Sequence, residues 1–155
     1  MFNHILNIFK QKAPHKKHIK ENYYNQQFRK AIEYQKNGNF KEALEIYKEL
    51  YIKLAQDNCQ KKLAIVLNNM IVVRKKLNYE AKGLFKKLLK LRFSLVMQYE
   101  ELYTIDYIYT LLMGVEWFNL PKDKLSQAES LLEMYSEFSI YQPTLERINK
   151  LRAVA

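Results

Sequence analysis

The sequence predicts an all-α protein of stacked antiparallel helical hairpins, with about three hairpins and one further helix at the C-terminal end. Three observations favour this fold class. The 155 residues include only 3 Gly and 3 Pro, which are common in the many turns of β-sandwiches and barrels. Apolar side chains recur three and four residues apart, the spacing of one helix face. With 48% hydrophobic residues, the chain can bury a core.

Residues 1–20 are predicted to form a basic N-terminal segment ahead of a helical domain, residues 21–155. The segment contains five Lys and no acidic residue. Four of its apolar residues fall at helical spacing: Phe2, Ile5, Leu6 and Phe9. It lacks the charged start and the cleavage site of a secretory signal. Such a segment either makes peripheral contact with an anionic membrane surface, or is a frayed tail or a helix that docks on the body of the protein.

The remaining apolar pattern predicts three helical hairpins, at about residues 22–56, 59–97 and 103–138. The first hairpin turns at Gly38, because glycine adopts the left-handed conformation that ends helices. Two helices joined by so short a turn must lie antiparallel. The third hairpin has a longer turn that contains Pro121. A last short helix, at about residues 143–153, begins at Pro143, which suits a first turn.

The first hairpin combines small and aromatic residues in a fixed order. Ala31 and Tyr34 lie three residues apart in its first helix. Gly38 lies in its turn, and Ala43 and Tyr47 lie four residues apart in its second helix. This arrangement resembles the tetratricopeptide repeat, whose unit is a helical hairpin. The resemblance implies a right-handed superhelix of stacked hairpins that acts as a protein-interaction module without catalysis.

The small-then-bulky spacing of the second helix recurs in the other two hairpins. The three sets are Ala43, Tyr47, Leu50; Ala81, Phe85, Leu88; and Ala128, Leu132, Tyr135. In the first helices, Asn69 and Gly114 stand at the small position of Ala31. Where two helices cross, a small residue on one helix lets an aromatic ring of the other helix pack directly against its backbone. The alternative to a repeat-like stack is an irregular helical bundle.

The positions that line the concave face of such repeats are apolar in this chain. They are Phe28, Ile32, Val66, Met70, Leu111 and Val115. One well-known subgroup of the family binds C-terminal carboxylates there with Lys, Arg and Asn, and the apolar residues argue against that clamp. They form either an apolar trough for a partner helix or the core of a short stack, and the need to bury apolar surface favours the core.

The net charge of +10 is distributed unevenly. Residues 74–97 contain eight basic residues and one acidic residue, whereas residues 98–138 contain two basic and eight acidic residues. A basic field attracts an acidic protein face, nucleic acid or anionic lipid, although surface charge also serves solubility alone.

Seven basic residues of this region are candidate partner contacts: Arg74, Lys75, Lys76, Lys82, Lys86, Lys87 and Lys90. Lys82, Lys86 and Lys90 recur every four residues and would form one stripe on a helix. Such a stripe fits an acidic protein face or a row of phosphates. Phe85 and Phe93 are expected to be buried with the neighbouring leucines. This argues against nucleic acid, because single-strand binders expose aromatic rings for stacking.

A second set of candidate contacts lies four residues apart beside acidic residues: Tyr99, Tyr103 and Tyr107. Aromatic residues are enriched at protein interfaces. In the alternative interpretation, each ring packs against the body of the protein while its hydroxyl reaches water.

Catalytic and metal-binding motifs such as G-x-S-x-G, H-E-x-x-H and C-x-x-C are missing from the sequence. His15 and His18 lie three residues apart without acids or Cys nearby to complete a metal site. The single Cys59 suits a reducing compartment and has no His in the body of the chain as a base. We therefore expect a cytoplasmic, non-catalytic protein without cofactor or metal.

The combined pattern predicts a module that binds a protein partner with an acidic surface or an acidic peptide or helix. An adaptor, a secretion chaperone and a toxin-neutralising protein all fit this description. The alternative is a basic helical protein that binds nucleic acid or an anionic membrane surface.

Overall fold

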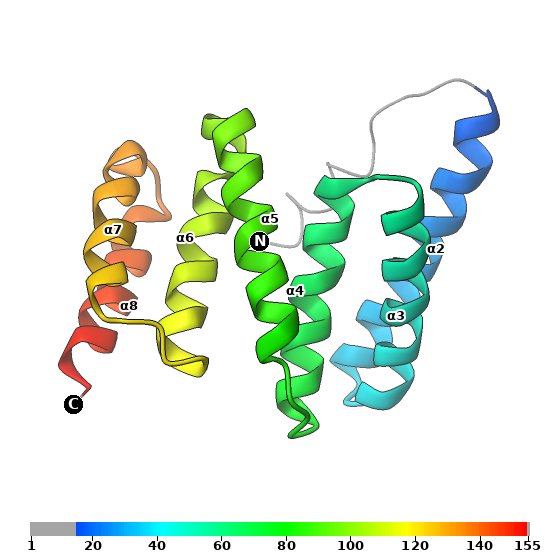
Figure 1. Ribbon diagram of the computed structural model, residues 1–155, viewed down its shortest axis with the longest axis horizontal. Coiled ribbons are helices and arrows are strands. Elements are labelled where there is room, and N and C mark those ends of the chain that lie inside the picture. The colour runs from blue at the N-terminus through cyan, green and yellow to red at the C-terminus, as the bar shows by residue number, and fades with distance from the viewer. Residues whose placement is uncertain (1–14, 155) are drawn as a thin grey trace. The chain divides into compact units, whose positions relative to one another are not determined.

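The computed structural model describes residues 15–154, with side chains from Lys20 onward, and every regular element in this range is helical (Figure 1). The elements are α2 (His15–Lys36), α3 (Phe40–Gln56), α4 (Gln60–Lys76), α5 (Lys82–Gln98), α6 (Glu100–Trp117), α7 (Asp123–Leu132), the 3-10 helix η1 (Glu133–Tyr135) and α8 (Tyr141–Ala153). The all-α prediction is confirmed. None of the described helices combines the length and apolar character that a membrane span requires.

The helices lie close to the ranges that the apolar spacing predicts, and the largest difference is at the start. Helix α2 begins at His15, inside the stretch predicted as a basic tail, rather than near residue 22. Pro143 lies in the first turn of α8, as predicted. The amphipathic pattern in the first nine residues and the side chains of His15 and His18 lie outside the described part of the chain.

Four helices are followed by a residue in the left-handed conformation: Gly38, Asn58, Asn78 and Asn119, with φ of 78°, 56°, 57° and 56°. After the first three, the next backbone N–H closes the helix by donating to the carbonyl five residues back. These bonds are Asn39 to Tyr34 at 2.9 Å, Cys59 to Leu54 at 3.0 Å and Tyr79 to Arg74 at 2.8 Å. The sequence pattern identified only the glycine, but asparagine tolerates the same conformation and ends the later helices.

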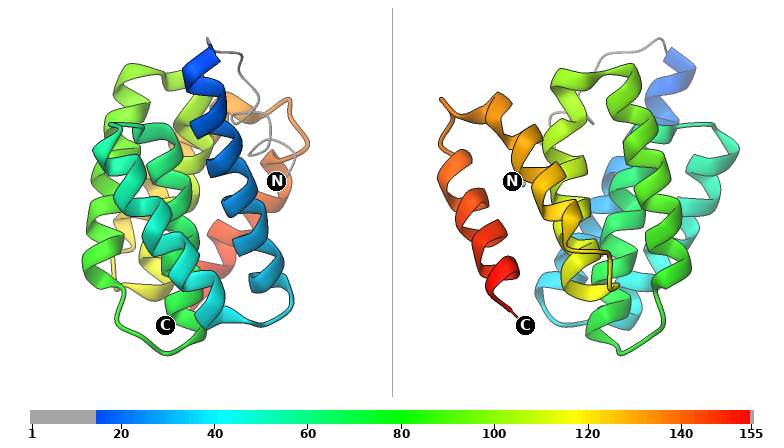
Figure 2. Two further views of the ribbon diagram at one scale, coloured as in Figure 1. Left: turned by 90° about the vertical axis from the view of Figure 1, so that its right-hand side faces the viewer. Right: turned by 60° about the vertical axis from the view of Figure 1, so that its left-hand side comes forward.

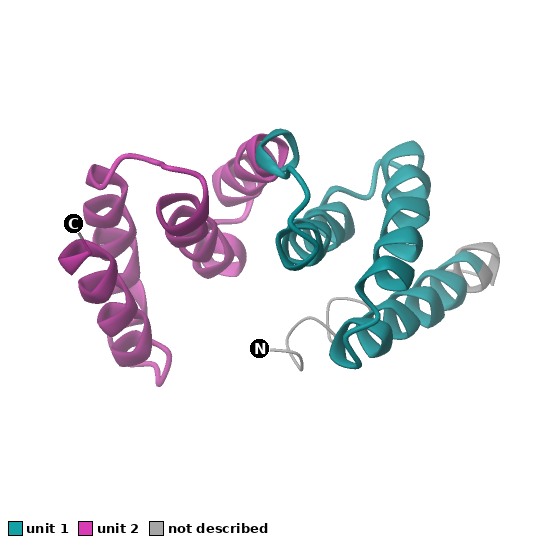
Figure 3. Cartoon of the chain, turned by 90° about the horizontal axis from the view of Figure 1, so that it is seen from below, with its two compact units in different colours: residues 1–84 teal, residues 85–155 magenta. Residues whose placement is uncertain are grey.

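The contacts within the chain divide it into two compact units, unit 1 (residues 1–84) and unit 2 (residues 85–155), with the boundary inside α5 (Figure 3). In unit 1, α2 packs on α3 and α3 packs on α4. Lys62 of α4 also forms a half-buried ion pair with Glu21 of α2, with 3.1 Å between nitrogen and oxygen.

Tyr47 of α3 lies fully buried in unit 1, where it is hydrogen-bonded to both neighbouring helices. Its hydroxyl donates to Gln35 Oε1 of α2 at 2.9 Å. Burial raises the pKa of Tyr47, and a hydrogen bond with the side chain of Asn69 on α4 partly offsets that rise. Asn69 stands at a position where the repeat pattern expects a small residue, because its amide satisfies a buried hydroxyl.

Tyr24 and Asp57 join the first half of α2 to the residue that follows α3. The Tyr24 hydroxyl donates to Asp57 Oδ2 at 2.5 Å, and Lys20 Nζ lies 3.7 Å from Asp57 Oδ1. Burial, followed by the bond to Asp57, raises the pKa of Tyr24 from its ordinary value of 10.0 to about 12. The same hydrogen bond lowers the pKa of Asp57 against a smaller opposing effect of burial.

The raised pKa of Tyr24 predicts how stability changes at alkaline pH. A tyrosine whose pKa rises on folding stabilises the fold below the unfolded pKa, and this contribution is lost as the pH rises from about 10 to about 12. The free energy of unfolding should therefore fall less steeply over that range in Tyr24→Phe than in the parent chain. Urea unfolding at pH 8, 10 and 12 measures the difference, with Tyr23→Phe as the exposed control. Equal slopes for Tyr24→Phe and the parent would contradict the prediction.

In unit 2, α6 packs on α7 and α7 on α8, and α6 also contacts α8 (Figure 2). Apolar residues of these three helices form the core: Ile108, Leu111, Leu112, Leu125, Ala128, Leu132 and Ile148. Arg147 of α8 pairs with Glu116 of α6 at 2.7 Å, and Arg152 of α8 pairs with Glu129 of α7.

Gly114 of α6 is the small residue against which an aromatic ring packs in unit 2. A Cβ atom at this position would lie 2.7 Å from Phe85 Cζ and would also overlap the Leu120 side chain. Phe85 in turn stacks on Phe118, with 4.5 Å between ring centroids and 9° between ring planes. The absence of a side chain thus lets the Phe85 ring lie against the backbone of α6.

The six apolar positions predicted to line a concave face belong to the cores of the two units. Four are buried, namely Phe28, Val66, Met70 and Leu111, and two are half-buried, namely Ile32 and Val115. Of the two interpretations, apolar trough and core, these six positions fit the core.

Candidate partner-binding face of helix α5

Helix α5 presents two different faces because its side chains follow two stripes at helical spacing. Phe85, Leu88, Arg92 and Leu95 are buried and recur three, four and three residues apart. The outward stripe consists of Lys86, Lys90, Phe93 and Met97, which recur four, three and four residues apart and are all exposed. We call these four residues the α5 face. It runs for roughly 16 Å along the helix, at 1.5 Å per residue.

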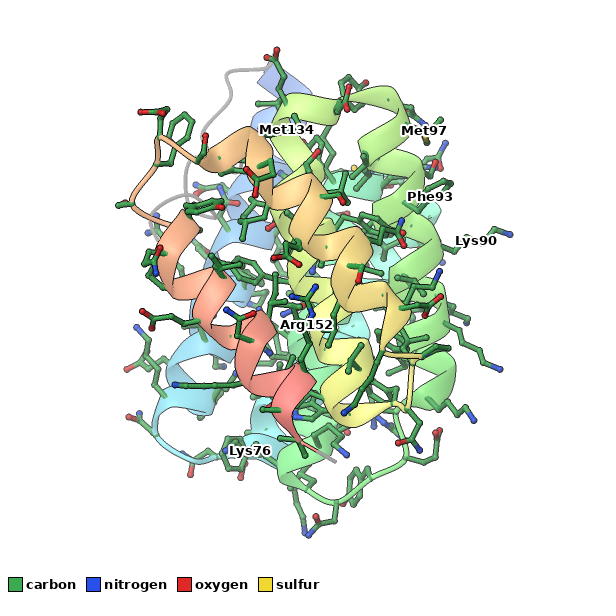
Figure 4. All side chains as sticks on the ribbon, turned by 90° about the vertical axis from the view of Figure 1, so that its left-hand side faces the viewer. Lys76, Lys90, Phe93, Met97, Met134 and Arg152 are labelled. Carbon is green, nitrogen blue, oxygen red and sulfur yellow. The ribbon has the colours of Figure 1, made fainter. Side chains whose placement is uncertain are left out.

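The α5 face is basic at one end and apolar at the other. Lys86 and Lys90 supply two ammonium groups, and Lys82, one turn earlier on the same helix, is also exposed. Phe93 is 48% exposed and Met97 is 72% exposed. Figure 4 shows Lys90, Phe93 and Met97 projecting from the same side of the helix.

The expectation that Phe93 is buried is wrong, whereas Phe85 is buried as expected. The reason is that the buried stripe passes through position 92, one residue before Phe93 and about 100° away around the helix. Position 92 is occupied by an arginine, which composition alone assigns to the surface. Phe93 is consequently turned outward beside Lys90.

Arg92 is only 7% exposed and links α5 to α6 by hydrogen bonds. Its guanidinium donates to Thr110 Oγ1 at 2.7 Å and to the backbone carbonyl of Asp106 at 3.2 Å. Burial lowers the pKa of Arg92, and the charge of Asp106 opposes this shift. Sequence reasoning missed Arg92, although the spacing of Phe85, Leu88 and Leu95 leaves a vacancy in the buried stripe at position 92.

Phe93 is held from one side by Tyr107 of α6, at 5.8 Å between ring centroids with the planes tilted by 55°. Tyr107 is 7% exposed, and burial raises its pKa, partly offset by a hydrogen bond with Gln127. The Tyr107 ring thus packs against one side of Phe93 and leaves the rest of that side chain exposed.

The three predicted tyrosine contacts have different surroundings. Tyr103 and Tyr107 are each 7% exposed, as in the interpretation that their rings pack against the body of the protein. Tyr99 is 43% exposed and meets the Tyr103 ring at 5.9 Å between centroids. Among these three tyrosines, only Tyr99 is exposed.

The remaining basic candidates divide between the two units. Arg74 is half-buried and its Nε donates to the carbonyl of Glu80 at 2.6 Å, so it supports the turn between α4 and α5. Its guanidinium also lies 5.7 Å from the centre of the Tyr79 ring. Lys75, Lys76 and Lys82 of unit 1 are exposed, and so is Lys87 of unit 2, beside the α5 face.

Among residues 20–154, whose side chains the structure describes, no three His, Cys, Asp or Glu side chains lie close enough together to hold a metal ion. Comparison with protein-family models, with curated proteins and with solved structures finds no match to this chain.

Proposed function

We propose that this chain is a cytoplasmic, non-catalytic protein-interaction module of the adaptor, secretion-chaperone or toxin-neutralising type, and that the α5 face binds an acidic segment of its partner. The observation that carries the proposal is the exposed stripe on α5, in which two lysines are followed by Phe93 and Met97. The same side of one helix thus offers positive charge and large apolar surface.

An acidic amphipathic helix complements this stripe. Its apolar side chains would cover Phe93 and Met97, and its carboxylates would lie near Lys86 and Lys90. Exposed ion pairs contribute little affinity each, about 0.2–1 kcal/mol, so the buried aromatic and thioether groups supply most of the binding energy. The lysines mainly set the orientation and the association rate.

A tetratricopeptide-like stacking of the hairpins belongs to the same proposal. Two features support it. The small positions Ala31, Ala43, Ala81 and Ala128 are all buried. Left-handed residues also recur at a constant interval along the first three helix ends, at 38, 58 and 78. Repeating units of this kind serve contact surfaces rather than chemistry in many proteins.

Charge reversal on α5 tests the proposal. The probe is a fluorescein-labelled 16-residue amphipathic peptide with Leu on one face and Glu on the other. Lys82→Glu, Lys86→Glu and Lys90→Glu together should weaken its binding at least about tenfold, because attraction becomes repulsion. Fluorescence anisotropy measures the affinity, and circular dichroism verifies that the fold is retained.

The matched control reverses three exposed lysines elsewhere and changes the net charge equally. Lys30, Lys41 and Lys150 are exposed on α2, α3 and α8. The control triple variant should weaken binding much less than the α5 triple variant. Equal weakening would show a non-specific charge effect and would remove the α5 face from the proposal.

Single-stranded nucleic acid is the second candidate partner, and the exposure of Phe93 beside Lys90 favours it. Bases stack on exposed aromatic rings while lysines follow the phosphates. A labelled oligothymidylate distinguishes the two candidates. If it binds more tightly than the acidic peptide, with a steep salt dependence and a loss on Phe93→Ser, nucleic acid is the partner.

A further inference from the structure

One end of unit 2 exposes large apolar side chains that neither the core nor the α5 face uses. Tyr99 and Leu102 lie where α5 gives way to α6, and they are 43% and 57% exposed. Met134 and Phe138 lie at and just after η1, and they are 44% and 62% exposed.

These four residues come from segments more than 30 positions apart, and Tyr135 brings the segments together. Its hydroxyl donates to the backbone carbonyl of Glu101 in the first turn of α6, at 3.5 Å. Its ring meets the Phe138 ring at 6.0 Å between centroids. Since Tyr135 also follows Met134 directly, Met134 and Phe138 lie at the end of unit 2 where α6 begins. Figure 4 shows Met134 near the same end of the helices as Met97.

The same end carries exposed acidic residues: Glu100, Glu101, Glu133 and Glu137. Glu133 accepts a hydrogen bond from the Tyr141 hydroxyl at 2.9 Å. The sequence contains no Lys or Arg between Arg92 and Lys122. We call the four apolar and four acidic residues the acid-rimmed end.

We propose that the acid-rimmed end docks a basic amphipathic helix of a second protein. Contiguous exposed apolar residues with a polar rim mark binding surfaces. The four carboxylates select a cationic ligand and repel nucleic acid, anionic lipid and acidic helices. Basic amphipathic helices carry Lys or Arg on one side and large apolar anchors on the other, and such anchors can cover Leu102 and Phe138.

This site is independent of the proposed function because its charge is opposite to that of the α5 face. The probe is a labelled 16-residue peptide with Leu on one face and Lys on the other, the counterpart of the acidic peptide. Added to the full chain, it should bind about tenfold more weakly to Leu102→Ser and to Phe138→Ser than to the parent. Glu100→Lys with Glu101→Lys should weaken it more at 50 mM than at 200 mM salt.

Two control variants give the experiment its specificity. Ile52→Ser removes a side chain of α3 that is 56% exposed, and it should leave the affinity for the basic peptide unchanged. Lys86→Glu with Lys90→Glu should weaken the acidic peptide but not the basic one. Failure of the α5 variants to affect the acidic peptide would count against the proposed function alone.

Three results would overturn the inference. The first is binding of the basic peptide that Leu102→Ser and Phe138→Ser leave unchanged. The second is tighter binding of a peptide with the sequence of residues 1–20, abolished by Leu102→Ser, because the occupant would then be this chain's own segment. The third is concentration-dependent self-association in sedimentation that Leu102→Ser abolishes, because the occupant would be a second copy.

Discussion

Gly114→Val is expected to lower the free energy of unfolding by roughly 3 kcal/mol or more, since overpacking of a close contact adds to the loss of side-chain freedom in a helix. A Cβ atom at position 114 would lie 2.7 Å from Phe85 Cζ and would overlap Leu120. Leu120 is half-buried and can move, but Phe85 is 1% exposed and stacked on Phe118. The Phe85 ring therefore cannot yield without breaking that stack.

Gly114→Ala gives a graded version of the same test. It should cost about 1–3 kcal/mol, because the overpacking exceeds the roughly 1 kcal/mol that Ala gains over Gly in a helix. Gly83 is the matched control, since a Cβ there meets nothing within 4 Å. Gly83→Ala should be neutral or stabilising. Urea unfolding followed by circular dichroism measures all three, and a stable Gly114→Val protein would show that α6 does not need this close approach.

Arg92→Ala is expected to destabilise the protein by about 3 kcal/mol, because it removes a buried side chain and its hydrogen bonds together. The Asp106 carbonyl keeps a hydrogen bond from Thr110 Oγ1 at 2.8 Å, so the main loss is the packing and the link from α5 to α6. Arg92→Met should cost less than Arg92→Ala, because it refills most of the volume without a buried charge.

The comparison separates the two roles of Arg92. If Arg92→Met were as damaging as Arg92→Ala, the charge and its hydrogen bonds would dominate rather than the packing. Lys86→Ala, on the exposed side of the same helix, should change the free energy of unfolding by no more than about 0.5 kcal/mol. Denaturant midpoints for the four proteins settle the order.

The existence and order of the helices could be predicted from the sequence because apolar spacing reports directly which helix face is buried. Gly38 was also predictable as a helix end, because glycine has an intrinsic preference for positive φ. Asn58, Asn78 and Asn119 adopt the same conformation. Asparagine also occurs in many other backbone conformations, so an asparagine alone does not predict a helix end.

The candidate site could be predicted only in part. The four-residue period predicts the lysine stripe of α5, whereas grouping Phe93 with the nearby leucines predicts a buried ring, and the ring is exposed. Its exposure depends on Arg92 taking the buried position, and that depends on partners 14 and 18 residues away on α6. The composition around position 92 does not show that groups far along the chain will form hydrogen bonds with a buried arginine.

The acid-rimmed end was likewise outside the reach of sequence reasoning. The acidic character of residues 98–138 was evident, but Met134 and Phe138 join Leu102 only through the fold, by way of Tyr135. The sequence therefore indicated charge on this stretch without indicating a surface.

An amide chemical-shift titration of the full chain with the acidic amphipathic peptide tests the central claim most directly, because it reports where contact occurs. The account predicts saturable shifts that are largest from Lys86 to Met97 on α5, and their loss in the Lys82→Glu, Lys86→Glu, Lys90→Glu variant. Largest shifts on another helix, or shifts that survive in that variant, would contradict it.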